Sequence, residues 1–279
     1  MDALLHFDLE HGINFFDHAD IYGGEGVCET IFGNVLKKQP ALRDKMFIQS
    51  KCGIHRSETN HYDFSKDYIL DSVDGILERL QIERLDSLLL HRPDALMEPE
   101  EVAEAFNHLE QAGKVRHFGV SNQNPMMMEL LKTAVKQPLK VNQLQLSAAF
   151  TPSFEAGFHV NMEGPKAAVR DGSVFEYCRL NDTVIQAWSV LQHGYFKGNF
   201  VGNEAFAALN HVLNDLAKKY QVTPTAIALA WVLRYPGKMQ AVIGTTKPQH
   251  VLEAGKAAEV TLTRKEWYQI YLAAGNDLP

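Results

Sequence analysis

The stretch FFDHADIYGG, residues 15–24, joins an apolar segment to a group of polar residues. Two phenylalanines lead directly into Asp17, and Tyr22 follows five residues later, before Gly23 and Gly24. An apolar run that ends in a carboxylate is typical of a buried strand that delivers a polar side chain to the end of a sheet. The stretch therefore predicts either an active site at a strand end or simply a strand followed by a turn.

Six further apolar runs follow along the chain and resemble the first. With NFFDH (14–18), they are MFIQSK (46–51), SLLLHR (87–92), HFGVSN (117–122), NQLQLS (142–147), TVIQAWS (183–189) and AVIGTT (241–246). Nearly continuous apolar strands are expected when both faces of a parallel sheet are covered by helices. The seven runs therefore predict seven strands of a parallel sheet.

The segments between these runs carry helical signals. Asn124 and Thr223 each precede a proline, a pattern that favours a helix N-cap followed by the first helical residue. Thr263 precedes a final helical segment. Apolar residues also recur on one helical face, at Ile69, Val73, Ile76, Leu77 and Leu80.

Alternation of strands and helices with short connections favours a (β/α)8 TIM barrel, an α/β fold, with an open doubly wound sheet as the second choice. No GxGxxG follows any strand, which lowers the second choice. A closed barrel needs eight strands, whereas seven are visible, and the chain begins within a helix that ends at Gly12. We therefore expect a single barrel domain over residues 1–279 that lacks the first strand, which would lie before Met1.

Composition restricts the function classes. The chain has 279 residues, 46% of them hydrophobic, and a net charge of −7 without a dominant basic run, so nucleic acid and anionic membranes are not expected partners. The sequence contains no run of about 18 apolar residues, so no membrane-spanning helix is predicted. The first residues also lack the features of a secretory signal. Cys28, Cys52 and Cys178 are widely spaced, which fits a reducing cytoplasm, and no histidine or cysteine spacing predicts a metal site.

Four strand-end residues form a coherent chemical set: Asp17, Tyr22, Lys51 and His91. The carboxyl ends of consecutive barrel strands meet at one mouth, where barrel active sites lie. A free tyrosine has a pKa of about 10 and is a poor acid at neutral pH, but a neighbouring ammonium favours the phenolate. Such a tyrosine can protonate a carbonyl oxygen. The hydride that completes the reduction must come from a cofactor, and a nicotinamide is the natural choice.

With these strand-end residues, the chain resembles the aldo-keto reductase family, whose members are NAD(P)H-dependent reductases with a (β/α)8 barrel. The resemblance lies in stretches that span nearly the whole chain in family order: DHADIYGG, SKCGI, LDSLLLHRPD, AGKVRHFGVSN, VNQLQLS and IGTTKPQHV. It implies that Asp17, Tyr22, Lys51 and His91 are the catalytic tetrad, with Tyr22 as the proton donor.

The resemblance also implies a cofactor site. Ser121, Asn122 and Gln143 match the positions that bind the nicotinamide carboxamide, and Trp188 matches an aromatic residue that stacks on the nicotinamide. The remaining positions match segments along the pyrophosphate and the adenosine end, namely Ser189, Leu191, Gly194, Gly244, Thr245, Lys247, His250 and Glu253. His250 departs from the arginine or glutamine common at its position, yet Lys247 can contact a 2′-phosphate, so NADP(H) is favoured over NAD(H).

Three hypotheses follow. The first is an NADP-dependent aldo-keto reductase, acting on CH–OH donors in the reverse direction, that reduces aldehydes or ketones to alcohols. Its partner is a small carbonyl substrate, and the protein is expected to be a monomer or weak oligomer. The second is a cofactor-binding regulatory or redox-sensing module with little turnover. The third is an inactive remnant truncated at its N-terminus, with exposed strand edges.

Overall fold

The computed structural model describes residues 2–56, 61–159, 165, 172–194 and 197–276. The chain divides into two compact units, which are residues 1–142 and 143–279. The expectation of one barrel domain over the whole chain stays a prediction.

Unit 1 contains alternating strands and helices with one small hairpin. Its elements are α1 (Asp2–Glu10), β1 (Phe15–Asp17), α2 (Val27–Lys38), the 3₁₀ helix η1 (Pro40–Lys45), β2 (Phe47–Cys52), β3 (Ile54–His55), β4 (His61–Tyr62), α3 (Lys66–Leu80), β5 (Leu85–Leu90), α4 (Pro99–Gln111), β6 (Val115–Ser121), α5 (Pro125–Lys132) and the start of β7 (Leu139–Gln145). Strands β1, β2, β5 and β6 pair in parallel, with Asp17 opposite Gln49 and Lys51 opposite Leu89.

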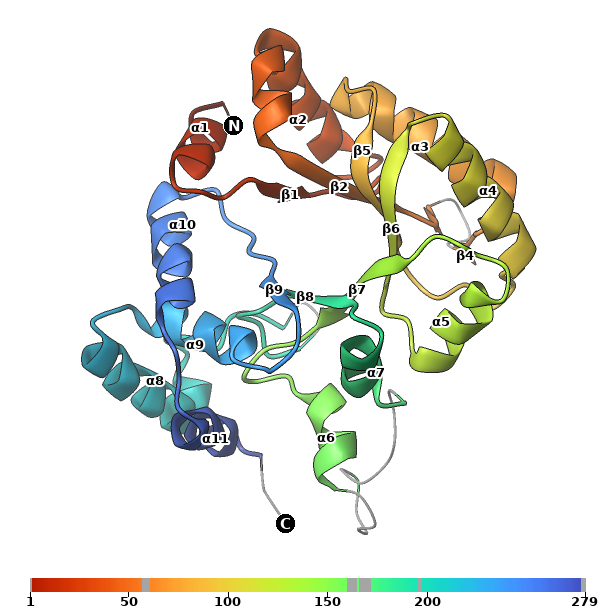
Figure 1. The fold of residues 1–279 in the computed structure, drawn as a ribbon. Helices are drawn as coiled ribbons and strands as arrows, with labels where there is room; N and C mark the ends of the chain where they lie inside the picture. Colours follow the sequence, from red (N-terminus) through yellow and green to blue (C-terminus); the bar gives the residue numbers. More distant parts are fainter. Residues whose placement is uncertain (1, 57–60, 160–164, 166–171, 195–196, 277–279) are drawn as a thin grey trace. The chain divides into compact units, whose positions relative to one another are not determined.

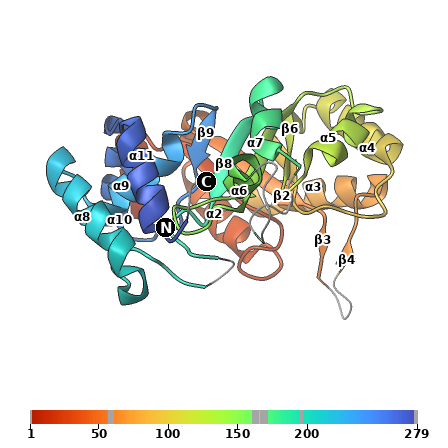
Figure 2. The ribbon, with the colours of Figure 1, turned by 90° about the horizontal axis from the view of Figure 1, so that it is seen from below.

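Apolar burial explains these elements. All six residues of β5 are buried, because helices cover the sheet, and α3 buries the five apolar residues that the helical period predicted. Helices α2, α3 and α4 lie next to one another along the strands of this unit (Figure 1). The hairpin of β3 and β4 extends away from the other strands of unit 1 and was not predicted (Figure 2).

Unit 2 holds the end of β7 and the remaining elements. They are α6 (Pro152–Phe158), α7 (Val174–Leu180), β8 (Val184–Trp188), η3 (Glu204–Phe206), α8 (Ala207–Tyr220), α9 (Pro224–Leu233), β9 (Met239–Ala241), α10 (Pro248–Gly255), η4 (Lys256–Glu259) and α11 (Arg264–Ala273). Its core lies around α9, whose residues 226–232 are all buried and which packs against α8 and α10 (Figure 1).

The predicted helix starts are confirmed. Asn124 accepts a hydrogen bond from the backbone N–H of Met127, and Thr223 accepts one from Ala226. Thr263 forms a capping box with Glu266, in which each side chain accepts from the other residue's backbone N–H.

The seven predicted strands are confirmed as one sheet in the order β1-β2-β5-β6-β7-β8-β9. The bounds of the last strand were wrong, because β9 comprises Met239–Ala241 instead of 241–246. Directly after β9, the N–H of Val242 donates to the carbonyl of Ala187. Ile243 packs against the core of unit 2, so the apolar character of this run reflects packing and not strand pairing.

Candidate active site

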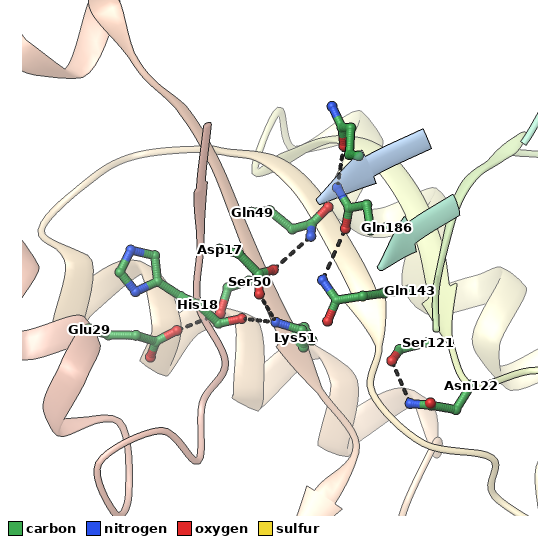
Figure 3. Close-up of polar contacts among 11 residues, drawn as sticks. Asp17, His18, Glu29, Gln49, Ser50, Lys51, Ser121, Asn122, Gln143 and Gln186 are labelled. Carbon is green, nitrogen blue, oxygen red and sulfur yellow. Dashed lines mark hydrogen bonds and ion pairs between the residues drawn. The ribbon is translucent and has the colours of Figure 1, made fainter. Parts of the chain in front are cut away.

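A buried ion pair lies at the carboxyl end of β1 and β2. Alternate residues of a strand share a face, so Gln49 and Lys51 both reach Asp17 on the neighbouring strand. The Nζ atom of Lys51 donates to Asp17 Oδ2 at 2.7 Å and to the His18 carbonyl at 2.6 Å (Figure 3). Gln49 Nε2 donates to Asp17 Oδ1 at 2.7 Å. The Lys51 side chain is completely buried, so its charge depends on these oxygen partners.

Tyr22 lies beside this ammonium. It belongs to the turn that follows β1, where Gly23 and Gly24 take positive φ values of 75° and 82°. The Tyr22 N–H donates to the Ala19 carbonyl at 3.0 Å. Lys51 Nζ lies 4.8 Å from the centre of the Tyr22 ring. The turn thus brings a phenol next to a buried positive charge.

His91 completes the group. It follows β5 directly, and its N–H donates to the Cys52 carbonyl of β2 at 2.8 Å. Its ring meets the Tyr22 ring edge-on, with centroids 5.9 Å apart. Burial, with the Lys51 charge as the next cause, lowers the pKa of His91 to about 2. The imidazole is therefore neutral at physiological pH, and its buried Nδ1 has no hydrogen-bond partner among the described residues.

Two polar residues of unit 1 lie at the end of β6. Ser121 is buried, and Asn122 follows it with a φ of 58°. Asn122 Nδ2 donates to Ser121 Oγ at 2.7 Å (Figure 3). This left-handed backbone turn presents a hydroxyl and an amide together, which is the donor and acceptor chemistry that a carboxamide requires.

In unit 2, the buried amides of Gln143 and Gln186 begin a hydrogen-bonded chain that ends at the exposed Gln240. Gln143 Nε2 donates to Gln186 Oε1 at 3.0 Å, and Gln186 Nε2 donates to Gln240 Oε1 at 2.9 Å (Figure 3). Trp188 is half-buried at the end of β8, and Ser189 follows with a φ of 52°. A partly accessible indole at a strand end can stack on a flat ring.

The other predicted cofactor residues of unit 2 lie after β8 and at the start of α10. Leu191 is half-buried, and Gly194 has a φ of 147°. Exposed Lys247 is the N-cap residue of α10, and its N–H donates to Thr245 Oγ1 at 3.1 Å. The same Thr245 oxygen lies 3.3 Å from His250 Nδ1, whereas Glu253 accepts from Gln249.

This segment suits an anion. Among the residues that the structure describes, apart from the two chain neighbours of Gly244, none has an atom within 4 Å of the position that a Cβ on Gly244 would occupy. A helix N-terminus offers backbone N–H groups and a positive dipole end, and Lys247 adds a charge at α10. The residues present therefore fit the phosphates of a nicotinamide dinucleotide.

Sequence reasoning missed the polar groups on the other face of β2. Glu29 is completely buried on α2, and its carboxylate accepts hydrogen bonds from Ser50 and Arg79. A signal was available, because Glu29 lies at helical spacing from Phe32 and Leu36, which are also buried. A charged residue on an apolar helical face indicates a buried partner.

Within the part of the chain that the structure describes, no helix is long and apolar enough to cross a membrane. Among the same residues, no group of three or more His, Cys, Asp or Glu side chains is arranged to hold a metal ion.

Known proteins match this chain over nearly its whole length. The aldo/keto reductase family profile matches residues 2–273. Oxidoreductase YdhF of Escherichia coli is 37% identical over 98% of this chain and 87% of its own length, so the chain resembles this oxidoreductase along nearly its whole length. A 6-dehydroglucose reductase of Agrobacterium fabrum is 36% identical over 97% of this chain and 86% of its own length.

Solved structures agree on the fold. An aldo-keto reductase from Klebsiella pneumoniae, crystallised with NADPH, superposes with a TM-score of 0.75 at 23% identity, over 96% of this chain and 82% of that one. The predicted barrel class is thereby confirmed, and with the family profile covering nearly every residue, the chain belongs to the aldo/keto reductase family.

Proposed function

We propose that the protein is an NADP(H)-dependent reductase that converts aldehyde or ketone carbonyls to alcohols, with Tyr22 as the general acid. The observation that carries the proposal is the completely buried Lys51 ammonium, held by Asp17 and positioned 4.8 Å from the centre of the Tyr22 ring. A buried ammonium beside a phenol stabilises the phenolate that remains after the proton has left.

The roles of the four side chains follow from charge. In reduction, the Tyr22 O–H bond breaks and its proton forms a new O–H bond on the carbonyl oxygen. Lys51 stabilises the resulting phenolate, and Asp17 keeps Lys51 oriented through their 2.7 Å contact. When bound, the dihydronicotinamide supplies the hydride that forms the new C–H bond.

His91 orients the substrate without supplying the proton. Its pKa of about 2 keeps the imidazole neutral, so one ring nitrogen can donate a hydrogen bond to the carbonyl oxygen. A neutral imidazole is a far weaker acid than imidazolium, which leaves Tyr22 as the proton source in the tetrad.

Each unit contains residues that we assign to cofactor binding. In unit 1, Ser121 and Asn122 would bind the nicotinamide carboxamide. In unit 2, Gln143 has the same proposed role, and Trp188 would stack on the nicotinamide. The pyrophosphate and adenosine end would lie against a further set in unit 2, namely Ser189, Leu191, Gly194, Gly244, Thr245, Lys247, His250 and Glu253. The exposed Lys247 at the N-terminus of α10 supports NADP(H) over NAD(H), because its charge suits a 2′-phosphate.

The proposed substrate is a small carbonyl compound. In the reverse direction, the protein would oxidise the CH–OH group of the corresponding alcohol. The protein acts in the cytoplasm as a monomer or weak oligomer. The name of the Agrobacterium relative makes keto sugars a sensible part of a substrate panel.

The test combines cofactor titration with turnover. NADPH and NADH are titrated by fluorescence, and consumption of each is followed at 340 nm with a panel of aldehydes, ketones and keto sugars. We expect NADPH-dependent turnover that Tyr22→Phe abolishes while cofactor affinity is kept. Tyr220→Phe serves as the control, because this residue lies in unit 2 and bonds Glu266.

Other outcomes discriminate between the hypotheses. Normal turnover by Tyr22→Phe would contradict the proposed acid. Tight NADPH binding without turnover on any carbonyl would favour the regulatory module, and a folded protein that binds neither nucleotide would favour the remnant.

A further inference from the structure

Glu29 is a buried carboxylate that none of the proposed catalytic steps uses. Its side chain is 0% exposed. Ser50 Oγ donates to Oε1 at 2.5 Å, and Arg79 Nε donates to Oε2 at 2.8 Å (Figure 3 for Ser50). Both carboxylate oxygens therefore have a partner, and these partners come from β2 and α3.

Ser50 and Lys51 are neighbours on β2, so their side chains lie on opposite faces of the sheet. Lys51 reaches Asp17, whereas Ser50 reaches Glu29 (Figure 3). Glu29 thus binds β2 at the residue directly before Lys51. A shift of this bond would move the backbone that carries the ammonium.

Glu29 is also connected to the turn that contains Tyr22, because the residues just before it in the chain bond to that turn. The N–H of Cys28, the residue before Glu29, donates to the Tyr22 carbonyl at 3.2 Å. The N–H of Val27 donates to the Gly24 carbonyl at 3.2 Å. The first turn of α2 therefore holds both the Tyr22 turn and the Glu29 carboxylate.

The surroundings of Arg79 are shaped for this bond. A Cβ on Gly26, which has a φ of 77°, would lie 2.2 Å from Arg79 Nε, and a Cβ on Gly75 would lie 2.9 Å from Arg79 Nη1. Gly75 occupies the interior of α3, where glycine is a poor helix former. Side chains at these two positions would crowd the guanidinium that reaches Glu29.

We propose that Glu29 is a positioning residue for the reduction: by binding Ser50 and Arg79, it fixes the start of α2 against β2 and so sets the distance between Tyr22 and Lys51. This inference rests on the proposed function, because it assigns Glu29 a role through the two residues of the proposed proton transfer. The geometry within unit 1 carries it.

The experiment uses the full chain with NADPH and the best aldehyde of the panel. Glu29→Gln keeps the size of the side chain but removes the negative charge that pairs with Arg79. Because the Ser50 hydroxyl can accept as well as donate, the glutamine keeps at most weaker, uncharged-acceptor hydrogen bonds to its two partners. We expect kcat to fall by about 10- to 100-fold, because a small misplacement of the reacting groups can slow a reaction by this factor. The affinity for NADPH should be unchanged. Ser50→Ala removes only one bond and should lower kcat in the same direction by less.

Two comparisons separate positioning from mere loss of stability. Glu266→Gln is the matched control, because Glu266 is also a buried carboxylate bound by a lysine, a tyrosine and a threonine, but in unit 2. It should lower the melting temperature and leave kcat unchanged at a temperature where the variant is folded. In a Tyr22→Phe background, Glu29→Gln should cause no further loss of the residual rate, because the proton donor that it positions is absent.

The outcomes are distinct from those of the proposed function. If Tyr22→Phe loses turnover but folded Glu29→Gln and Ser50→Ala keep the full kcat, the positioning role is wrong and the reductase proposal stands. An equal fractional loss from Glu29→Gln with and without Tyr22 would also overturn it. If Tyr22→Phe keeps its turnover, the reductase mechanism itself fails.

Discussion

Lys51 Nζ lies 2.7 Å from Asp17 Oδ2, and the lysine side chain has no exposed surface. Removing one partner of such a buried pair leaves the other charge uncompensated. We expect Lys51→Met to lower kcat by about 10²- to 10⁴-fold, the usual range for loss of acid–base assistance. The same change should reduce the free energy of unfolding by about 3–5 kcal/mol. Steady-state kinetics and urea unfolding measure the two effects.

The double variant Asp17→Asn with Lys51→Met is the control, because it removes both charges. It should recover much of the lost stability without recovering activity. Recovery of both would indicate that the pair serves only to hold the fold.

Two buried histidines of unit 1 should make stability depend on pH. The pKa of His91 is lowered to about 2 and that of His18 to about 4, and burial is the largest cause of both shifts. An unfolded histidine titrates near pH 6.5, so below that pH the unfolded chain binds protons that the folded chain does not, and stability falls with decreasing pH. Above pH 6.5, the lowered pKa of His18 does not reduce the free energy of unfolding. The reduction grows as the pH falls below 6.5 and reaches its full size near pH 4.

His18→Gln tests this dependence without altering the tetrad side chains. Between pH 6.5 and 5, the slope of unfolding free energy against pH should decrease by up to about 1.4 kcal/mol per unit relative to the wild type. Urea unfolding at half-unit pH intervals gives the slope. Identical slopes would show that His18 is protonated equally in both states.

Asp20 should act in the opposite sense. Burial, followed by the Glu29 charge, raises its pKa to about 7, and its Oδ1 atom is buried without a hydrogen-bond partner among the described residues. Between its unfolded pKa, near 4, and about 7, the folded chain holds a proton that the unfolded chain lacks. Stability from this group therefore falls as pH rises through this range, and the loss is complete above pH 7.

Asp20→Asn removes that titration. Its melting temperature relative to the wild type should be higher at pH 8.5 than at pH 5.5, because only the wild type must ionise a buried carboxyl. Melting curves at the two pH values test this, and a difference independent of pH would contradict the assignment.

The proximity of Asp17, Tyr22, Lys51 and His91 was predictable because apolar runs precede them and parallel strands bring their carboxyl ends to one edge, whereas their catalytic role stays a prediction. Asp17, Lys51 and His91 required only this topology. The bounds of β9 were not predictable in the same way, since Ile243 is apolar through packing against the core of unit 2. An apolar run carries no information on whether its backbone pairs or only packs.

Glu29 illustrates a second limit. Its helical spacing indicated burial, but its two partners, Ser50 and Arg79, lie 21 and 50 residues away along the chain. Only the packing of α2 and α3 against β2 identifies them. Gln49 was missed for a related reason, because its bond to Asp17 depends on the register between β1 and β2.

Lys247 should distinguish the two nicotinamide cofactors. It is exposed at the N-terminus of α10, where its ammonium suits the 2′-phosphate found only in NADP(H). Lys247→Met should raise the KM for NADPH by about tenfold, equivalent to about 1.4 kcal/mol, and leave the KM for NADH unchanged. Lys256→Met is the control, since Lys256 pairs with Glu259 on the surface. Equal effects on both cofactors would exclude a phosphate contact.

The core of unit 2 contains a reciprocal pair of tryptophans. Each indole Nε1 donates to the other residue's carbonyl at 3.0 Å, and the rings stack with centroids 4.8 Å apart. Trp231 lies in the last turn of α9, where carbonyls lack intrahelical partners, whereas the Trp267 carbonyl is in position to accept from the N–H of Tyr271 in α11. The two hydrogen bonds therefore differ in what their loss leaves unsatisfied.

Trp267→Phe should cost more stability than Trp231→Phe, because it leaves the Trp231 carbonyl buried without a donor. An unsatisfied buried acceptor costs about 1–3 kcal/mol, whereas loss of the Trp231 donor leaves Trp267 with its helical partner. Urea unfolding of both variants, each retaining an aromatic ring in the stack, measures the difference. Equal losses, or a larger loss in Trp231→Phe, would show that ring packing and not the capping of α9 dominates this contact.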